Sequence, residues 1–289
     1  MFDLHKCNLC PRECGADRTK KAGACGAGEK MRVAKIMKHY FEEPPISGTK
    51  GSGAIFFAGC NLGCVYCQNA EISHGAKSGE EYSPERLAAA ALNLQESGVH
   101  NINLVTAAHF LPQVAEFLRI AKPKLKIPVV YNSSGYEKAE ALRALDSLVD
   151  VYLPDFKYIS ADAARRYSAA PDYPEIAEKA IAEMVRQTGE YSERDGLAVR
   201  GTVIRHLVLP SLSQDGVKIM QRIAELYKGV RVSVMSQYTP EFCDGKYKEI
   251  CRKITTMEYN RVLAAARECG LDGFMQSRES ATSEYTPEW

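Results

Sequence analysis

Three cysteines near residue 60 are spaced closely enough to hold one metal centre. Cys60, Cys64 and Cys67 follow the short apolar run 54–57, with the spacing Cys-x3-Cys-x2-Cys. Thiolates are soft ligands that select iron–sulfur clusters or zinc. A structural zinc site is normally closed by four protein ligands. Three thiolates without a nearby fourth therefore favour a 4Fe-4S cluster in which one iron is free to bind a small molecule.

This spacing, with the aromatic Tyr66 directly before the third cysteine, resembles the signature of the radical S-adenosylmethionine superfamily. The resemblance implies that the open iron chelates the amino and carboxylate groups of S-adenosylmethionine. An electron from the cluster then breaks the sulfur–C5′ bond and yields a 5′-deoxyadenosyl radical. A reductant such as flavodoxin or ferredoxin is the expected electron source. The alternative interpretation is a thiolate site for zinc, in a binding module without turnover.

A second set of cysteines lies in the first fifty residues. Cys7, Cys10, Cys14 and Cys25 have glycines nearby, which suits a small knuckle that turns sharply around a metal. Zinc is the first expectation because four thiolates complete its coordination. A second iron–sulfur cluster is the main alternative, and four unliganded cysteines are the third. We expect residues 1–50 to form a cysteine-rich extension and residues 51–289 to form the catalytic domain.

Bulk composition excludes several classes of protein. The chain has 37 basic and 36 acidic residues, a net charge of +1, so a nucleic-acid partner is not favoured. It has no apolar run of about 18 residues that could span a membrane. The first residues do not resemble a signal peptide, and most cysteines belong to the two sets above, so a reducing cytoplasm is expected. Cys243, Cys251 and Cys269 are scattered and are expected to be free or buried thiols.

The elements that position these residues alternate between strand and helix after Gly53. Predicted strands cover residues 54–57, 101–106, 128–131, 149–154, 202–209 and 230–235, with a short seventh at 273–275. Predicted helices cover residues 84–97, 111–121, 136–145, 174–187, 214–227 and 256–269. This alternation predicts right-handed βαβ units around a parallel sheet. Six units are fewer than the eight of a closed barrel. The expected fold is therefore α/β, a partial and laterally open (β/α)6 barrel with a small N-terminal extension.

Polar residues recur where the predicted strands end, which is the edge at which sites collect in such sheets. Each of them alone has an ordinary explanation as turn chemistry, but their recurrence at successive strand ends favours a site. With Tyr66, the candidates for cofactor binding are Thr106, His109, Asn132, Ser134, Asp155, Lys157, Arg205 and His206.

Within the superfamily, residues from about 53 to 240 are similar to the pyruvate formate-lyase activating enzymes, which are glycyl-radical activases. Residues 132–136 resemble the turn near the adenosine in that group, residues 155–157 its Asp-Leu-Lys motif, and residues 203–210 its Ile-Arg-Tyr-Val-Val-Val-Pro strand. The resemblance implies that five of the candidates lie near S-adenosylmethionine or the substrate: Asn132, Asp155, Lys157, Arg205 and His206. The substrate is then expected to be a glycyl-radical-type protein, with a small molecule as the alternative.

One motif departs from that group. The activases carry Gly-Gly-Glu-Pro after the second strand, where it holds the methionyl amino group, whereas residues 106–109 here read Thr-Ala-Ala-His. The hydroxyl and backbone groups of this loop must then do that work. His109 is a candidate contact to the cofactor, with a helix cap as the alternative. Glu42 and Glu43 are expected to be a solvated patch, although they could also reach the mouth of the site.

Overall fold

The computed structural model describes residues 3–74, 78–243 and 245–276. Its centre is a sheet with the strand order β10-β9-β8-β6-β5-β4-β2-β1-β3. The parallel strands are β2 (Ser52–Phe57), β4 (Ile102–Val105), β5 (Val129–Ser133), β6 (Val151–Pro154), β8 (Leu197–Leu207), β9 (Arg231–Met235) and β10 (Gly273–Met275). Within the described sheet the edge strands β3 and β10 do not pair with each other, which confirms the predicted open barrel.

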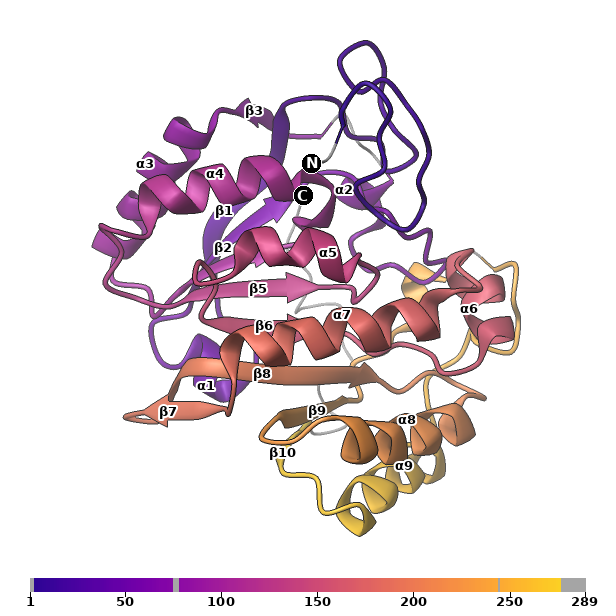
Figure 1. The fold of residues 1–289 in the computed structure, drawn as a ribbon. Helices are drawn as coiled ribbons and strands as arrows, with labels where there is room; N and C mark the ends of the chain where they lie inside the picture. The colour runs from indigo at the N-terminus through magenta and orange to yellow at the C-terminus, as the bar shows by residue number, and fades with distance from the viewer. Residues whose placement is uncertain (1–2, 75–77, 244, 277–289) are drawn as a thin grey trace.

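Helices cover the outer face of this sheet (Figure 1). The longer ones are α3 (Pro84–Glu96), α4 (Leu111–Ala121), α6 (Ala161–Ser168), α7 (Tyr173–Thr188), α8 (Ser213–Leu226) and α9 (Thr256–Glu268). The apolar stripe of α4 is fully buried at Val114 and Leu118 and packs in one core with Leu104 of β4. Ser83 caps the start of α3, since its hydroxyl accepts from the Arg86 backbone N–H at 3.2 Å. No helix in the described part of the chain combines the length and the apolar character needed to cross a bilayer.

Part of the predicted N-terminal extension belongs to the main sheet. Strand β1 (Met31–His39) pairs antiparallel with β2 and with β3 (Glu80–Tyr82). Its residues Met31 and Val33 are buried in the same core as Ile55 of β2. The expected boundary at residue 50 therefore cuts through the sheet, and the part of the extension without helix or strand is residues 3–30.

The segment between β1 and β2 fills the inside of the partial barrel. It carries the short helix α1 (Pro44–Ser47), which lies beside β8 (Figure 1). Ile46 of α1 packs with Val130, Val151 and Val203, which are buried residues of β5, β6 and β8. These residues alternate along their strands with the ones that face the outer helices. Residues 40–47 consequently form a plug on the inner face, and this plug is a wall of the pocket described below.

Shorter elements differ from the prediction. The expected helix 136–145 is only α5 (Ala139–Leu142) followed by the 3-10 turn η2 (Arg143–Leu145). Strand β7 (Ser192–Arg194), which forms a hairpin with β8, and helix α6 were not predicted. The short elements α2 (Ala70–Ser73), η1 (Ala108–Phe110) and η3 (Pro240–Phe242) lie in loops. Elements of this length carry too few residues for a periodic pattern to stand out.

The prediction for the scattered cysteines was wrong for two of them. Cys243 and Cys251 form a disulfide, with their Cα atoms 5.7 Å apart. The loop between η3 and α9 folds back and brings the two residues together, which spacing alone did not indicate. Cys269 is a free, half-buried thiol at the end of α9.

Candidate functional site

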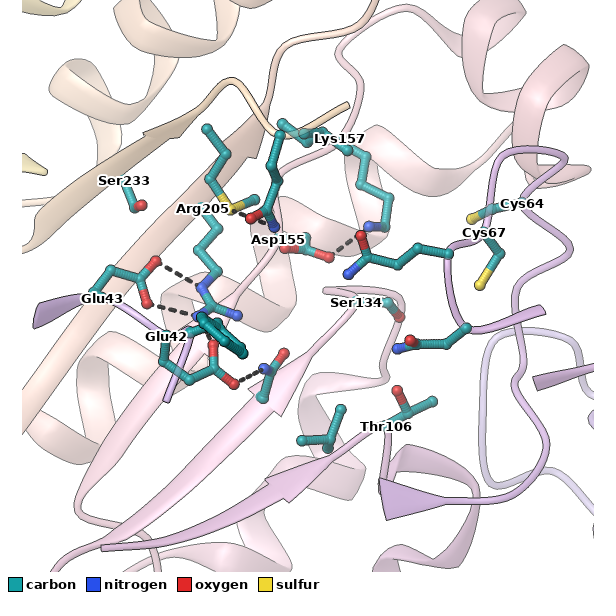
Figure 2. Close-up of a pocket in the computed structure, with 18 of the residues that line it drawn as sticks. Glu42, Glu43, Cys64, Cys67, Thr106, Ser134, Asp155, Lys157, Arg205 and Ser233 are labelled. Atoms are coloured by element: carbon teal, nitrogen blue, oxygen red, sulfur yellow. Dashed lines mark hydrogen bonds and ion pairs between the residues drawn. The ribbon is translucent and has the colours of Figure 1, made fainter. Parts of the chain in front are cut away.

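The loop that carries the three closely spaced cysteines begins where β2 ends. Gly59 has a φ of +88°, a conformation that glycine adopts without steric cost. Beyond this turn, Cys60, Cys64 and Cys67 all line one pocket. Figure 2 shows Cys64 and Cys67 at one end of it. We call this the cluster end of the pocket.

The thiols at the cluster end are buried (Cys64) or partly buried (Cys60 and Cys67), with few hydrogen-bond partners. Cys64 Sγ lies 3.0 Å from the Ser168 hydroxyl, and Cys67 Sγ lies 3.3 Å from the Ser73 hydroxyl. Burial raises the pKa of Cys64 to about 11. Burial, with the neighbouring thiols, also raises the pKa of Cys60 far above its ordinary value. Because thiolates are the ligating form, a bound metal cation would favour deprotonation and offset their repulsion.

A 4Fe-4S cluster fits this donor set. The three thiols are soft ligands, and they border a cavity into which an additional ligand could reach. Beside them, Asn69 Oδ1 is a buried acceptor without a hydrogen-bond partner. Across the described residues, no three His, Cys, Asp or Glu side chains already stand at metal-ligand spacing. The loop must therefore close around a metal when one binds.

The pocket extends from the cluster end into the barrel and has a volume of about 270 Å³. Its walls come from the ends of the parallel strands, from the plug and from the cysteine loop (Figure 2). Of the predicted site residues outside the cysteines, those lining it are Tyr66, Thr106, Asn132, Ser134, Asp155, Lys157 and Arg205.

Asp155 and Lys157 form an ion pair in the middle of the pocket (Figure 2). Burial would lower the pKa of Lys157, but Asp155 and the nearby Cys64 raise it well above its ordinary value. The ammonium therefore stays charged, and it lowers the pKa of Cys64 in return. This pair places a fixed cation beside the thiols and a carboxylate on the pocket wall.

The ends of β4 and β5 supply neutral polar groups. Thr106 has a φ of +60°, a glycine-like conformation at the position where the activases carry glycine. Its backbone N–H donates to the Asn132 carbonyl at 3.1 Å. The turn after Ser134 passes so close to β6 that a Cβ on Gly135 would lie 2.4 Å from the Asp155 carbonyl oxygen. Glycine is thus required there for the Ser134 turn to form the pocket wall.

Tyr66 lies in a chain of hydrogen bonds that leads back to a cysteine. Its hydroxyl is 2.5 Å from that of Tyr158, and the Tyr158 hydroxyl is 2.9 Å from that of Ser168. Ser168 in turn contacts Cys64. The aromatic residue before the third cysteine therefore borders the pocket and helps to fix the loop.

Two of the predicted cofactor contacts, His109 and His206, do not face the pocket. The His109 Nε2 atom is 2.8 Å from the Ala58 carbonyl, behind the cysteine loop. The His206 Nδ1 atom is 2.9 Å from the Phe156 carbonyl, and a Cβ on Gly216 of α8 would lie 2.8 Å from its Nε2 atom. Burial lowers the pKa of each histidine to about 4, so both are neutral near pH 7. They are structural residues on the far side of the strand ends.

At the opposite end of the pocket, Arg205 is held by two carboxylates, Glu42 and Glu43, for which the sequence favoured a solvated patch and offered the mouth of the site only as the alternative. Its Nε atom donates to Glu43 at 2.8 Å, and its Nη2 atom contacts both Glu42 and Glu43 (Figure 2). Burial would raise the pKa of Glu42, but Arg205 and His39 lower it. We call this the inner end of the pocket. The expected solvated patch is instead a buried ion cluster, and the missed signal was an arginine in an otherwise apolar strand, which needs a partner.

The four N-terminal cysteines lie together outside the pocket. Cys14 lies beside Cys7, and Cys10 lies close enough to Cys25 and Cys7 for their charges to interact. The segment that carries them lies against the cysteine loop, since the Cys60 backbone N–H donates to the Cys25 carbonyl at 3.1 Å. The two sets of cysteines are therefore neighbours in space.

Comparisons with known proteins agree with this arrangement. The family described as the Radical SAM superfamily matches residues 54–210, more than half of the chain. An uncharacterized protein, MJ0674 of Methanocaldococcus jannaschii, is 30% identical over 278 residues, which cover 92% of this chain and 75% of that protein.

Two solved structures are similar to part of this chain, and the first of them shares its fold. SuiB of Streptococcus suis, bound to the precursor peptide SuiA, is 14% identical over 75% of this chain, with a TM-score of 0.52. The chain spans 46% of SuiB. A domain of pyruvate-formate lyase-activating enzyme from Bacteroides vulgatus is 10% identical over 58% of this chain and 92% of that domain, with a TM-score of 0.45.

Members of this superfamily are enzymes that use a 4Fe-4S cluster and S-adenosylmethionine. The matched region contains the three-cysteine loop and the strand ends that line the pocket from β4 to β8. On this family match, the chain belongs to the radical SAM superfamily.

Proposed function

We propose that Cys60, Cys64 and Cys67 hold the 4Fe-4S cluster and that S-adenosylmethionine binds in the pocket beside it. When bound, the cluster would supply the electron that breaks the sulfur–C5′ bond of S-adenosylmethionine, which gives methionine and a 5′-deoxyadenosyl radical. With both groups held there, the pocket would allow abstraction of a hydrogen atom from a substrate, which would be left as the radical while 5′-deoxyadenosine is released. The observation that carries the proposal is the shared pocket of three thiols and the polar strand ends.

The chain's own groups would bind and orient the cofactor. Asn69, with its unpartnered buried oxygen beside the thiols, can accept from the methionyl ammonium. The Thr106 hydroxyl replaces the missing carboxylate of the activases as a second polar contact there. Ser134 and Asp155 line the wall further in, where they can meet the adenosine hydroxyls. Enclosure of the cofactor by these strand ends keeps water from the reacting atoms.

The size of the pocket bears on the substrate. Pockets for one drug-sized ligand begin at roughly 300 Å³, and this one measures about 270 Å³. The cofactor would therefore fill most of it, and only a small group of the substrate could reach the radical. The activase resemblance supports a single residue of a protein, of the glycyl-radical type. The second candidate is a small molecule, because a pocket whose inner end is closed by the ion cluster could enclose one.

The first experiment is an anaerobic reaction with S-adenosylmethionine and either dithionite or reduced flavodoxin. The expected products are 5′-deoxyadenosine and methionine, formed slowly without the true substrate. The control is the Cys64→Ala protein, which should form neither. Accumulation of S-adenosylhomocysteine without 5′-deoxyadenosine would refute the proposal, and so would a colourless protein that binds only zinc.

The second experiment separates the two substrate classes. An extract of cells grown in deuterated medium is divided into a protein fraction and a small-molecule fraction, and each is added to the reaction. The fraction that contains the substrate should transfer deuterium into 5′-deoxyadenosine, which mass spectrometry detects. Transfer from the protein fraction alone supports the activase-like function, whereas transfer from the small-molecule fraction alone excludes it.

A further inference from the structure

The N-terminal cysteine segment is docked directly on the first cysteine of the cluster loop. The backbone N–H of Cys60 donates to the Cys25 carbonyl at 3.1 Å. The approach is so close that a Cβ on Gly59 would lie 2.5 Å from the same oxygen. Cys25 is therefore in direct backbone contact with the residue that begins the three-cysteine set.

Two arginines of the segment reinforce this contact. Arg12 donates to the Asn61 carbonyl at 2.8 Å and also to the carbonyls of Ser168 and Ala169. Arg12 thus joins the cluster loop to the end of α6, where Ser168 contacts Cys64. Arg18 donates at 2.7 Å to the carbonyl of His109, whose ring supports the loop from behind.

The segment lacks an obvious source of its own rigidity. Residues 3–30 contain no helix or strand, and the buried aliphatic side chains among them are Leu9, Ala16 and Ala27. So small a core rarely stabilises a unit, and natural domains of this kind use a metal instead. Two of its four cysteines lie beside Gly23, whose Cβ would lie 3.4 Å from Cys14 Sγ and 3.7 Å from Cys25 Sγ.

We propose that Cys7, Cys10, Cys14 and Cys25 bind one zinc ion, and that the zinc-bound segment holds Cys60 in position for the catalytic cluster. Tetrahedral zinc with Zn–S bonds of about 2.3 Å brings its sulfurs to about 3.8 Å from each other. Four thiolates complete the coordination of zinc without a further ligand, and the sulfurs of Cys14 and Cys25 both lie within 4 Å of the position of a Cβ on Gly23. The second half of the proposal rests on the proposed function of Cys60, and the first half does not.

The zinc site is tested by metal analysis of the full-length protein, purified anaerobically. We expect about one zinc and about four iron per chain. Cys10→Ser should lose the zinc, whereas Cys269→Ser, a control thiol outside both sets, should lose neither metal. The triple variant of Cys60, Cys64 and Cys67 to alanine should lose the iron and keep the zinc.

The outcomes separate the two proposals. Absence of zinc from the wild-type protein, or about four iron remaining in the triple variant, would overturn the zinc site, the latter by assigning an iron–sulfur cluster to the segment. Zinc without iron in the wild-type protein would instead contradict the proposed function and leave the zinc site intact.

The contact between the two sites is tested without changing any cysteine. Gly59→Ala should keep the zinc but displace the Cys25 carbonyl, and we expect the cluster to be lost to a chelator roughly tenfold faster. Gly98→Ala is the matched control, because Gly98 has a φ of +86° but no atom within 4 Å of the added Cβ. Equal rates of cluster loss in the two variants would refute the positioning role.

Arg12 provides an independent test with a different control. Arg12→Met should keep the zinc and accelerate cluster loss, and it should alter the electron paramagnetic resonance signal of the reduced cluster. Arg12→Lys should restore part of the stability. Arg86→Met, which removes an exposed arginine paired with Glu80, should leave rate and signal unchanged. An unchanged rate and signal in Arg12→Met would overturn the contact.

Discussion

The two ends of the pocket satisfy their polar groups in different ways. At the inner end, Arg205 contacts Glu42 and Glu43, and Glu42 also accepts from Asn103 and Asn132. At the cluster end, the three thiols have only long or weak contacts, to the Leu62 backbone N–H and to two hydroxyls, and one amide oxygen has no partner. The charged groups of the inner end are thus paired once the chain folds, although the Oδ1 atom of Asn103 has no partner there, whereas the thiols of the cluster end await their ligands.

This difference predicts that the inner end contributes mainly to stability and the cluster end mainly to function. Groups that are paired within the protein contribute to the folded state before any ligand arrives, and removing one partner leaves a buried charge. Polar groups without partners raise the free energy of the ligand-free protein, and a bound ligand removes this cost because it supplies the partners. We therefore expect mutations at the inner end to act on folding and mutations at the cluster end to act on metal and cofactor.

The largest effect is expected at the cluster end. Cys64→Ala removes one of three thiolates, so the iron content and 5′-deoxyadenosine production should fall to background. Urea unfolding of the metal-free protein should change little, because the thiol has no strong partner there. Iron analysis, chromatography and the Cys269→Ala control check this. A Cys64→Ala protein that still cleaves S-adenosylmethionine at the normal rate would sink the assignment of the cluster.

The next largest effect is expected at the inner end. Arg205→Met leaves two buried carboxylates unpaired, which should reduce the free energy of unfolding by roughly 3–5 kcal/mol. Arg222→Met is the matched control, because Arg222 also pairs with two glutamates, Glu178 and Glu225, but is partly exposed. Arg222→Met should therefore reduce the free energy of unfolding by about 1 kcal/mol or less. Equal losses in urea titrations would contradict the difference between the two ends.

Glu137 extends the comparison, because this buried carboxyl group is hydrogen-bonded to two hydroxyls and not to a cation. Glu137 accepts from the hydroxyls of Tyr131 and Ser133, and burial raises its pKa to about 7. The folded protein therefore holds a proton that the unfolded chain releases above about pH 4.5. Stability should fall by roughly 3 kcal/mol as the pH rises from about 4.5 to about 7, and then level off.

Glu137→Gln should remove this dependence, since glutamine cannot titrate. The measurement is the free energy of unfolding at several pH values for both proteins. If the wild-type and Glu137→Gln curves run parallel over that range, the raised pKa is excluded. Glu42 provides the contrast, because Arg205 lowers its pKa and its stabilisation is lost as the pH falls instead.

The smallest effect is expected in the middle of the pocket. Asp155→Asn removes the partner of Lys157 and a proposed contact to the cofactor, and it should weaken S-adenosylmethionine binding by about 1.5–3 kcal/mol while iron is retained. Asp162→Asn, which alters an exposed pair with Arg165, is the control. Calorimetric titration of the reconstituted proteins measures the difference. Wild-type affinity in Asp155→Asn would exclude a cofactor contact at this position.

The order of strands and helices could be predicted because hydrophobic periodicity is a local property. The predicted strand at 230–235 became β9, and the short strand at 273–275 became β10. Local spacing also kept Cys60, Cys64 and Cys67 near one another, since two or three intervening residues cannot separate thiols by far. These features depend on neighbours in the chain, and the sequence alone determined them.

The faces and long-range partners were decided only by the tertiary structure. Adjacent strand residues point to opposite faces, so Arg205 enters the pocket while His206 packs toward α8. Glu42 and Glu43 are more than 160 residues from Arg205 in the sequence. They contact it because the plug crosses the inside of the barrel. In the same way, Cys25 meets Cys60 only where the N-terminal segment docks on the cluster loop. Such pairings depend on how separate elements pack, a property that local patterns do not encode.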